Sequence, residues 1–206
     1  NSVMAQGGMQ IAVAPDDSPV QHFLDTLKGG HMKNDHELLK VMVEEGPSIA
    51  KWLLELGVLF DRDADGNLHV KKGGGSSKAR LLTCSDYTGL EIMRVLKDEV
   101  LNQKIPLLEF VAAVELLSDA KGACTGAVLK DLDNNRFVVV AAKTVILATG
   151  GIGRLHIQGF PTSNHFGATG DALVLAYRLG VPLVQIDTFQ YHPSGGVYPE
   201  QLVGAL

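Results

Sequence analysis

The sequence predicts a mixed α/β fold, and three observations carry that prediction. Segments 18–57 and 88–101 have the apolar spacing of amphipathic helices. Three segments between residues 107 and 140 are rich in β-branched residues and are separated by turn residues. Segment 144–148 is short, β-branched and continuously apolar, and glycines stop it at Gly150, which is typical of a buried parallel strand.

Capping signals and a proline define the first three predicted helices. Ser18 can cap a helix over residues 19–27, because its hydroxyl oxygen accepts a bond from a backbone N–H and proline follows at the first helical position. Asp35 can cap a second helix over residues 36–45, and Pro47 is expected to begin a third helix that ends at the next glycine. The predicted apolar face of the second helix carries Leu38, Leu39, Met42 and Val43.

An Asp-Gly turn between two short apolar segments predicts a β-hairpin over residues 58–70. Asp61, Asp63 and Asp65 alternate there as in a calcium loop. The twelfth position of that loop would need glutamate, and it holds Lys72. We therefore interpret the three carboxylates as solvated acids on a hairpin. The glycine-rich segment that follows lacks the lysine spacing of a phosphate-binding loop.

The middle of the chain predicts one helix and a three-stranded meander. Ser85 or Asp86 can cap a helix over residues 88–101. The core side of that helix carries Ile92, Val95 and Leu96. Strands are expected over the segments 107–117, 124–129 and 136–140, with an Asp-Asn-Asn turn between the last two. The pattern of residues 111–116 is also compatible with a helix, but β-branched residues after Pro106 favour a strand.

The last third of the chain predicts a strand, a glycine turn, a helix and a second strand in that order. The helix is expected over residues 172–179 and the second apolar strand over residues 181–186, followed by His192-Pro193. Glycine directly after a strand lets a ligand or backbone approach closely, because no Cβ stands in the way. This order of elements is therefore where a binding site is expected.

The composition excludes several classes of partner. The chain has 206 residues, of which 20% are charged, and a net charge of −5, so nothing favours nucleic acid or an anionic membrane. Cys84 and Cys124 lack metal-type spacing, so neither a metal site nor a disulfide framework is expected. We find no signal peptide and no apolar run long enough to span a bilayer. The sequence favours the cytoplasm over the periplasm.

Five short motifs follow one another along the chain. They are Asn1-Ser2-Val3-Met4-Ala5-Gln6-Gly7-Gly8-Met9, Asp86-Tyr87-Thr88-Gly89, Ala148-Thr149-Gly150-Gly151, Thr169-Gly170-Asp171 and His192-Pro193-Ser194-Gly195. Their order and spacing resemble the FAD-dependent flavoprotein subunits of fumarate reductase and succinate dehydrogenase. L-Aspartate oxidase and the 3-ketosteroid dehydrogenases are more distant relatives of that family. The family also carries a basic residue after a glycine-rich segment, and Arg80 matches it.

The resemblance implies a Rossmann-like FAD-binding domain of β/β/α type over residues 1–190 and the start of a capping domain over residues 191–206. The G-x-G-x-x-G motif of the family precedes its Asn1 segment and does not occur here, so we expect a truncated, internal fragment. Non-covalent FAD is implied, because Asn1 stands where flavinylated members carry histidine. The implied FAD contacts are Asn1, Ser2, Ala5, Gln6, Gly7, Gly8, Ala148, Thr149, Gly150, Thr169, Gly170 and Asp171.

The resemblance also implies reduction of an activated C=C bond in a dicarboxylate-like small molecule, with His192 as the catalytic residue. The arginines that bind dicarboxylate in the family are expected beyond Leu206. Two alternatives stay open: a non-catalytic flavin- or nucleotide-binding module, and a flavin dehydrogenase for succinate, L-aspartate or a 3-ketosteroid. The electron donor is unknown from sequence. An uncovered sheet edge in a truncated domain predicts self-association.

Overall fold

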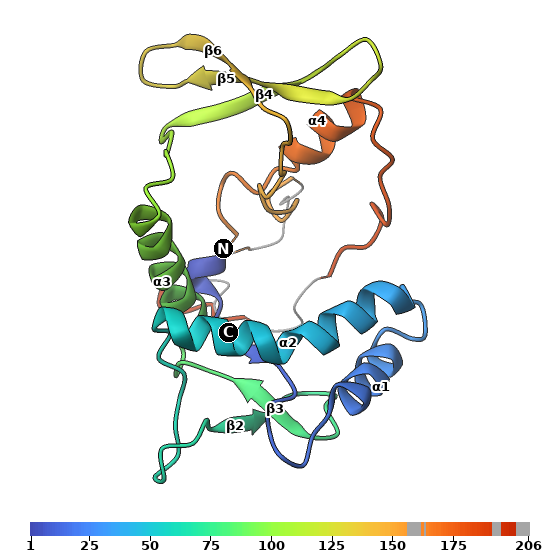
Figure 1. Cartoon of the computed structure of the whole chain (residues 1–206), viewed down its shortest axis with the longest axis vertical. Helices are drawn as coiled ribbons and strands as arrows, with labels where there is room; N and C mark the ends of the chain where they lie inside the picture. The colour runs from blue at the N-terminus through green and yellow to red at the C-terminus, as the bar shows by residue number, and fades with distance from the viewer. Residues whose placement is uncertain (156–161, 163, 191–194, 201–206) are drawn as a thin grey trace. The chain divides into compact units, whose positions relative to one another are not determined.

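The chain folds as two units, Asn1–Ile105 and Pro106–Leu206. The computed structural model describes residues 1–155, 162, 164–190 and 195–200. Among the described residues, the first unit contains three α-helices and a small sheet, and the second contains a larger sheet with one α-helix against it (Figure 1). The predicted domain boundary at residue 190 adjoins residues outside the described ranges, and it stays a prediction.

The first two helices begin at the predicted capping residues. Helix α1 spans Pro19–Gly29, and the Ser18 hydroxyl oxygen accepts a hydrogen bond of 3.1 Å from the N–H of Gln21. Helix α2 spans His36–Leu56, and the Asp35 carboxylate accepts bonds from the first turn of that helix. Each cap satisfies N–H groups that have no partner inside the helix.

Helix α2 continues through Pro47, so the prediction of two separate helices was wrong. The proline removes one backbone hydrogen bond, but burial of a single stripe on both sides of it outweighs that loss. The buried stripe consists of Leu39, Val43, Ala50 and Leu53. The predicted apolar face was right for Leu39 and Val43 only, since Leu38 and Met42 are 70% and 50% exposed.

A small antiparallel sheet forms the core of the first unit with α2 and the helix α3, which spans Thr88–Asn102. Its strands are β1 (Met9–Gln10), β2 (Val70–Lys72) and β3 (Ala79–Leu82), in the order β1-β3-β2. The predicted 58–70 hairpin is reduced to one bridge between Arg62 and Leu68. Val58 and Phe60 are buried in the core without strand pairing, so the predicted strand there was wrong.

Helix α3 begins without the predicted side-chain cap. Its N-cap position is Tyr87, and neither Ser85 nor Asp86 bonds to the first turn among the interactions of the described residues. The predicted core face is confirmed, because Val95 is buried and Ile92 and Leu96 pack against the same cluster. Backbone carbonyl groups of the N-terminal segment take the place of this side-chain cap, and they form part of the candidate functional site.

The second unit is built on the predicted meander. Strands β4 (Val111–Ser118), β5 (Cys124–Asp131) and β6 (Arg136–Ala141) pair antiparallel in chain order. Helix α4 (Asp171–Arg178) packs against β4, with Leu175 in one cluster with Leu116 and Ala127. The expected turn before β6 forms, since the Asp131 carboxylate accepts hydrogen bonds from the backbone N–H groups of Asp133 and Asn134.

Segments 144–148 and 181–186 are not strands in the described structure, so both strand predictions were wrong. Ile146 is 85% exposed and Val184 is 82% exposed. A strand exists only where a neighbour completes its ladder of backbone hydrogen bonds, and no described strand pairs with either segment. The mixed helix and sheet class itself is confirmed.

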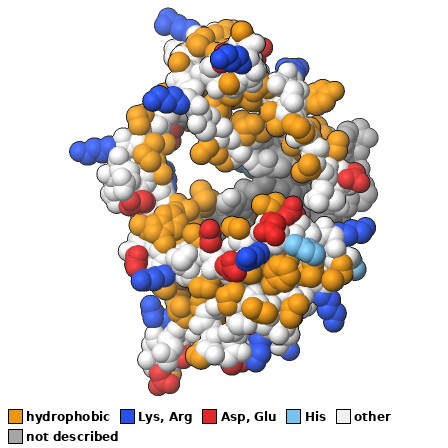
Figure 2. Space-filling model, turned by 45° about the vertical axis from the view of Figure 1, so that its right-hand side comes forward, with side chains coloured by type: hydrophobic (Ala, Val, Ile, Leu, Met, Phe, Trp, Pro, Cys, Tyr) orange, Lys and Arg blue, Asp and Glu red, His pale blue; other side chains and the backbone are white. Residues whose placement is uncertain are grey.

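Both units expose many large apolar side chains to solvent (Figure 2). All six residues of β6 are exposed, including Phe137 and Val139. Among the helices of the described residues, none combines the length and apolarity needed to cross a bilayer.

Candidate functional site

The N-terminal segment, residues 1–8, lies against the first turn of α3. It opens with a 3₁₀ turn, Ser2–Met4. The carbonyl of Ala5 accepts a hydrogen bond of 2.8 Å from the N–H of Gly89. The hydroxyl of buried Thr88 lies 3.5 Å from the carbonyl of Gln6. Backbone carbonyls of this segment therefore serve as the cap that no described side chain gives to α3.

Two glycines allow this close packing. A Cβ on Gly89 would overlap the carbonyl oxygen of Ser2 and lie 2.8 Å from the Cβ of Ala5. A Cβ on Gly8 would overlap the carbonyl of Leu82, and Gly8 also has a φ of +89°. Only glycine fits at each of these two positions. The contact at Gly89 joins the Asn1 motif to the Asp86–Gly89 motif through the backbone, and the contact at Gly8 joins the Asn1 motif to β3.

The opposite side of the segment is open. Residues 1–7 are exposed, and no acceptor among the described residues takes the N–H groups of Gln6 and Gly7. A Cβ on Gly7 would meet no described atom within 4 Å. Exposed backbone N–H donors suit a ligand rich in acceptor atoms, and the flavin ring is such a ligand. The residues present therefore fit the group that the motifs imply.

A carboxylate supports the turn that leads into α3. Asp61 accepts hydrogen bonds from the Thr83 hydroxyl at 2.6 Å and the Ser85 N–H at 3.0 Å, and it pairs with Lys71. The bond from Thr83 is the largest cause that lowers the pKa of Asp61, partial burial opposes it, and Ser85 and Lys71 add to the lowering. Asp61 is therefore a structural anion, and the prediction of a solvated acid was wrong for this residue.

In the second unit, the glycine turn after residue 149 contacts the Thr169-Gly170-Asp171 motif. The N–H of Gly170 donates to the carbonyl of Gly151 at 3.2 Å, and the N–H of Arg154 donates to the carbonyl of Ala168 at 2.8 Å. Gly170 has a φ of +77°, and a Cβ there would lie 2.7 Å from the side chain of Ile152. The structure thus brings these two motifs together within one unit.

Helix α4 starts directly after this contact. Its N-cap is Gly170, and neither Thr169 nor Asp171 caps it with a side chain. Instead the Thr169 hydroxyl lies 3.0 Å from the Asp171 carboxylate, which is exposed. Ala148, Thr149 and Gly150 are exposed beside it, which leaves backbone and carboxylate oxygens accessible to a ligand.

The predicted cofactor contacts thus form two groups, one in each unit, and each group is internally connected. His192, the predicted catalytic residue, lies outside the described residues. Among the described residues, no cluster of three histidine, cysteine or acidic side chains could hold a metal ion. Cys84 is buried, and burial with nearby Glu91 and Asp61 raises the pKa of its thiol to about 11, so it is not a nucleophile at neutral pH.

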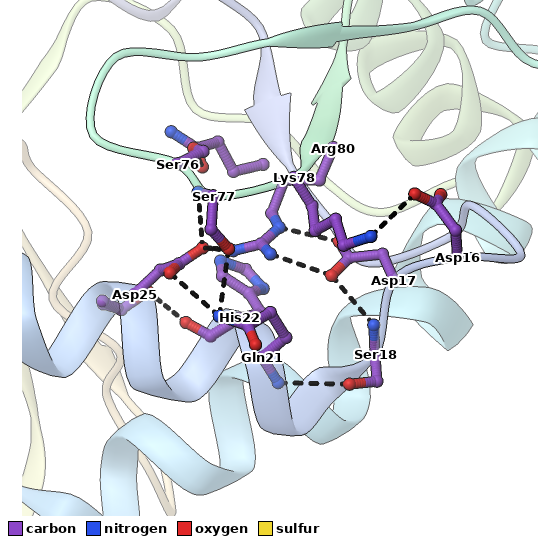
Figure 3. A network of polar contacts seen from close by, with 12 residues as sticks. Asp16, Asp17, Ser18, Gln21, His22, Asp25, Ser76, Ser77, Lys78 and Arg80 are labelled. Carbon is purple, nitrogen blue, oxygen red and sulfur yellow. Dashed lines mark hydrogen bonds and ion pairs between the residues drawn. The ribbon is translucent and has the colours of Figure 1, made fainter.

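A buried arginine network lies at the other end of β3 from Leu82 (Figure 3). The Arg80 guanidinium donates two bonds to Asp17, at 2.7 and 2.8 Å, and one to Asp25 at 2.8 Å. The side chains of Arg80 and Asp17 are fully buried. Burial works against the charge of Arg80, but the bonds to the two carboxylates outweigh it and raise the pKa of the guanidinium.

The same network orders the glycine-rich loop and helix α1. Burial opposes ionisation of Asp25, but hydrogen bonds from the Ser77 N–H and hydroxyl and from Gln21 lower its pKa to about 2. Buried His22 lies beside Arg80, and burial together with that cation lowers the pKa of its imidazole. No sequence pattern pointed to this network, although strand alternation places Arg80 on the same face as buried Leu82.

A family model described as FAD binding domain matches residues 1–205. The chain is 37% identical over 206 residues to one of the subunits of the CoM/CoB fumarate reductase of Methanothermobacter marburgensis, covering 98% of the chain and 37% of that protein. It is 34% identical over 198 residues to a chloroplastic L-aspartate oxidase of Arabidopsis thaliana, covering 94% of the chain and 30% of that protein.

Among solved structures, the chain resembles Mycobacterium smegmatis Sdh1 in complex with UQ1. The TM-score is 0.91 at 34% sequence identity, and the match covers 100% of this chain and 36% of that one. The chain therefore spans about a third of the length of these three relatives.

Proposed function

The chain belongs to the FAD binding domain family, with the flavoproteins of fumarate reductase, succinate dehydrogenase and L-aspartate oxidase, and from this premise we propose that the full-length protein reduces an activated C=C bond. Its cofactor is FAD. We propose fumarate or a similar dicarboxylate as the substrate.

The observation that carries the proposal is the family match over residues 1–205 together with the relative named as a fumarate reductase. The five motifs support it, because four of them pack in pairs within their own units.

The motif residues have binding or positioning roles in this proposal. The N–H groups of Gln6 and Gly7 donate to acceptor atoms of the flavin, and residues 148–150 present backbone that a ligand can approach. Thr169 and Asp171 bind polar groups of the cofactor. FAD, when bound, supplies the hydride. Asn1 carries a carboxamide, which cannot form a histidyl bond, so the cofactor is held without a covalent link.

His192 is the proposed substrate residue. A histidine side chain donates a hydrogen bond to a carboxylate, and the bond is stronger when the imidazole is charged. That bond would hold one carboxylate of the substrate and withdraw electron density from its C=C bond.

The test uses the full-length protein. Its flavin is reduced anaerobically, fumarate is added, and reoxidation is followed by visible absorbance in wild type, His192→Ala and the control His69→Ala. His69 is exposed and contributes only its backbone N–H to a bond with Asp61. We expect rapid reoxidation in wild type and His69→Ala and its loss in His192→Ala. If fumarate does not reoxidise the reduced flavin of the wild-type protein, the substrate proposal is wrong.

L-Aspartate oxidation is the second candidate, because an L-aspartate oxidase is among the relatives at 34% identity. In this reaction the two electrons move from the substrate to the flavin, whereas in fumarate reduction they move from the flavin to the substrate. Anaerobic addition of L-aspartate to the oxidised protein distinguishes the two. Bleaching of the flavin by L-aspartate, without reoxidation by fumarate, would favour the oxidase.

The isolated 206-residue chain is expected to bind FAD weakly or not at all. The motif that binds the pyrophosphate in dinucleotide folds does not occur in it. Equilibrium dialysis against FAD measures this directly. Purification of the chain with stoichiometric flavin would contradict the expectation.

A further inference from the structure

We infer that Gly89, with Thr88, is a positioning residue for the flavin: the start of α3 sets the conformation in which Gln6 and Gly7 present their N–H groups to the cofactor. The inference rests on the proposed FAD contacts of residues 1–7. It goes beyond them, because neither Thr88 nor Gly89 is itself one of the proposed contacts.

The polar groups of the N-terminal segment divide between its two sides. The carbonyls of Ala5 and Gln6 face α3, where Gly89 N–H and the Thr88 hydroxyl lie at 2.8 and 3.5 Å. The N–H groups of Gln6 and Gly7 have no acceptor among the described residues. The contact with α3 therefore fixes which side of each peptide plane faces outward, since a peptide N–H and C=O point in opposite directions.

Steric contact at Gly89 also sets how close the segment lies to α3. Gly89 is buried, and a Cβ there would overlap the Ser2 carbonyl, which is backbone and cannot rotate away. Substitution at Gly89 must therefore move residues 2–5 away from α3. The outward N–H groups of the following residues would move with them.

The support beneath the start of α3 is rigid. The Thr88 hydroxyl accepts a bond of 3.1 Å from the Cys84 N–H, and both residues are buried. Asp61 holds the intervening turn through the Ser85 N–H. Thr88 and Gly89 thus have a fixed position in the core, whereas residues 1–7 are exposed, so α3 positions the segment and not the reverse.

The experiment compares Gly89→Ala with Gly29→Ala in the full-length protein. Gly29 is an exposed residue at the end of α1, and a Cβ there would meet no described atom within 4 Å. FAD is removed from each protein, and three quantities are measured: the FAD dissociation constant by titration, the visible spectrum of the rebound flavin, and the melting temperature of the apoprotein.

We expect Gly89→Ala to weaken FAD binding by roughly tenfold or more, as loss of hydrogen bonds to a ligand does. The spectrum of the bound flavin should shift, and Gly29→Ala should match wild type in both respects. A purely structural role of Gly89 would lower the apoprotein melting temperature and leave affinity and spectrum at wild-type values. That result would overturn the inference.

A second variant decides the matter if Gly89→Ala does not fold. Thr88→Val keeps the shape of the side chain and removes its hydroxyl, and Thr88→Ser restores the hydroxyl. Weakening of FAD binding by roughly two- to tenfold in the valine variant, with recovery in the serine variant, supports the inference. Unchanged FAD binding in Thr88→Val would overturn it. The proposed reaction fails separately, in the fumarate assay, because FAD titration requires no substrate.

Discussion

Replacement of Arg80 by alanine should destabilise the first unit severely. The side chains of Arg80 and Asp17 are fully buried, and that of Asp25 is 15% exposed. Removal of the guanidinium leaves both carboxylates without their cation. Breaking a buried ion pair in this way costs about 3–5 kcal/mol, because an uncompensated charge stays in a medium that solvates it poorly. We expect a loss in that range for Arg80→Ala.

The control is Arg94→Ala on α3. Arg94 also contacts two carboxylates, Glu91 at 2.8 Å and Asp98 at 3.3 Å, but its side chain is 50% exposed. Exposed pairs contribute less than about 1 kcal/mol. Hydrogen exchange of peptides from α1 and β3, measured by mass spectrometry over a urea series in the full-length protein, reports the free energy of opening the unit.

The pH dependence provides an internal check. Arg80 is one of the groups that lower the pKa of Asp25, so without it the Asp25 carboxylate takes up a proton more readily. The difference in opening free energy between wild type and Arg80→Ala should therefore narrow as the pH falls from 7 toward 3. Two outcomes would refute the reasoning. One is an Arg80→Ala loss no larger than that of Arg94→Ala, and the other is a difference that widens at low pH.

Three further predictions concern single groups. Ser18→Ala should cost about 1 kcal/mol in the opening free energy of α1, because the N–H of Gln21 loses its capping acceptor; hydrogen exchange of that helix measures it, and an unchanged rate would contradict the role of the cap. The pKa of Asp25 is lowered to about 2 from 3.8, so its contribution to stability is complete above the unfolded value and should be lost as the pH falls from about 4 to 2; an acid titration of the unit that stays flat in this window would contradict it. At pH 8, a thiol reagent should modify Cys124 well before Cys84, whose buried thiol stays protonated; equal rates in peptide mapping would show that the thiol of Cys84 is accessible.

Local signals predicted the elements that local interactions determine. The cap at Ser18 and the turn before β6 depend on side chains within three residues of the groups they bind, so the sequence contains the whole cause. The prediction failed at Pro47 because the interactions that decide the structure there are not local. The stripe that carries α2 past it is buried by residues far away in the chain, such as Ile11.

The parallel strand expected over residues 144–148 illustrates the same limit. Its composition suits a buried strand, but a strand requires neighbours, and composition cannot supply them. Fold class followed from the pattern of elements, while pairing did not.

The candidate site was predicted unevenly. The motifs around Asn1 and Gly89 were identified by resemblance, but the close contact between them, which requires glycine at position 89, is evident only in the folded structure. Arg80 was recognised as the basic residue after a glycine-rich segment, yet its carboxylate partners come from positions 17 and 25. The role of His192 stays a prediction.

Because α2 runs without interruption, it links the two apolar clusters of the first unit and so affects how that unit unfolds. Its first half joins α1 in one apolar cluster through Leu39 and Val43, and its second half joins the main core through Ala50 and Leu53. The bond already missing at Pro47 makes that point the weakest link between the halves. Partial unfolding should therefore release α1 and half of α2 as one piece, and the ion pairs of Arg80 together with the hydrogen bonds of Ser77 help to hold that piece in place.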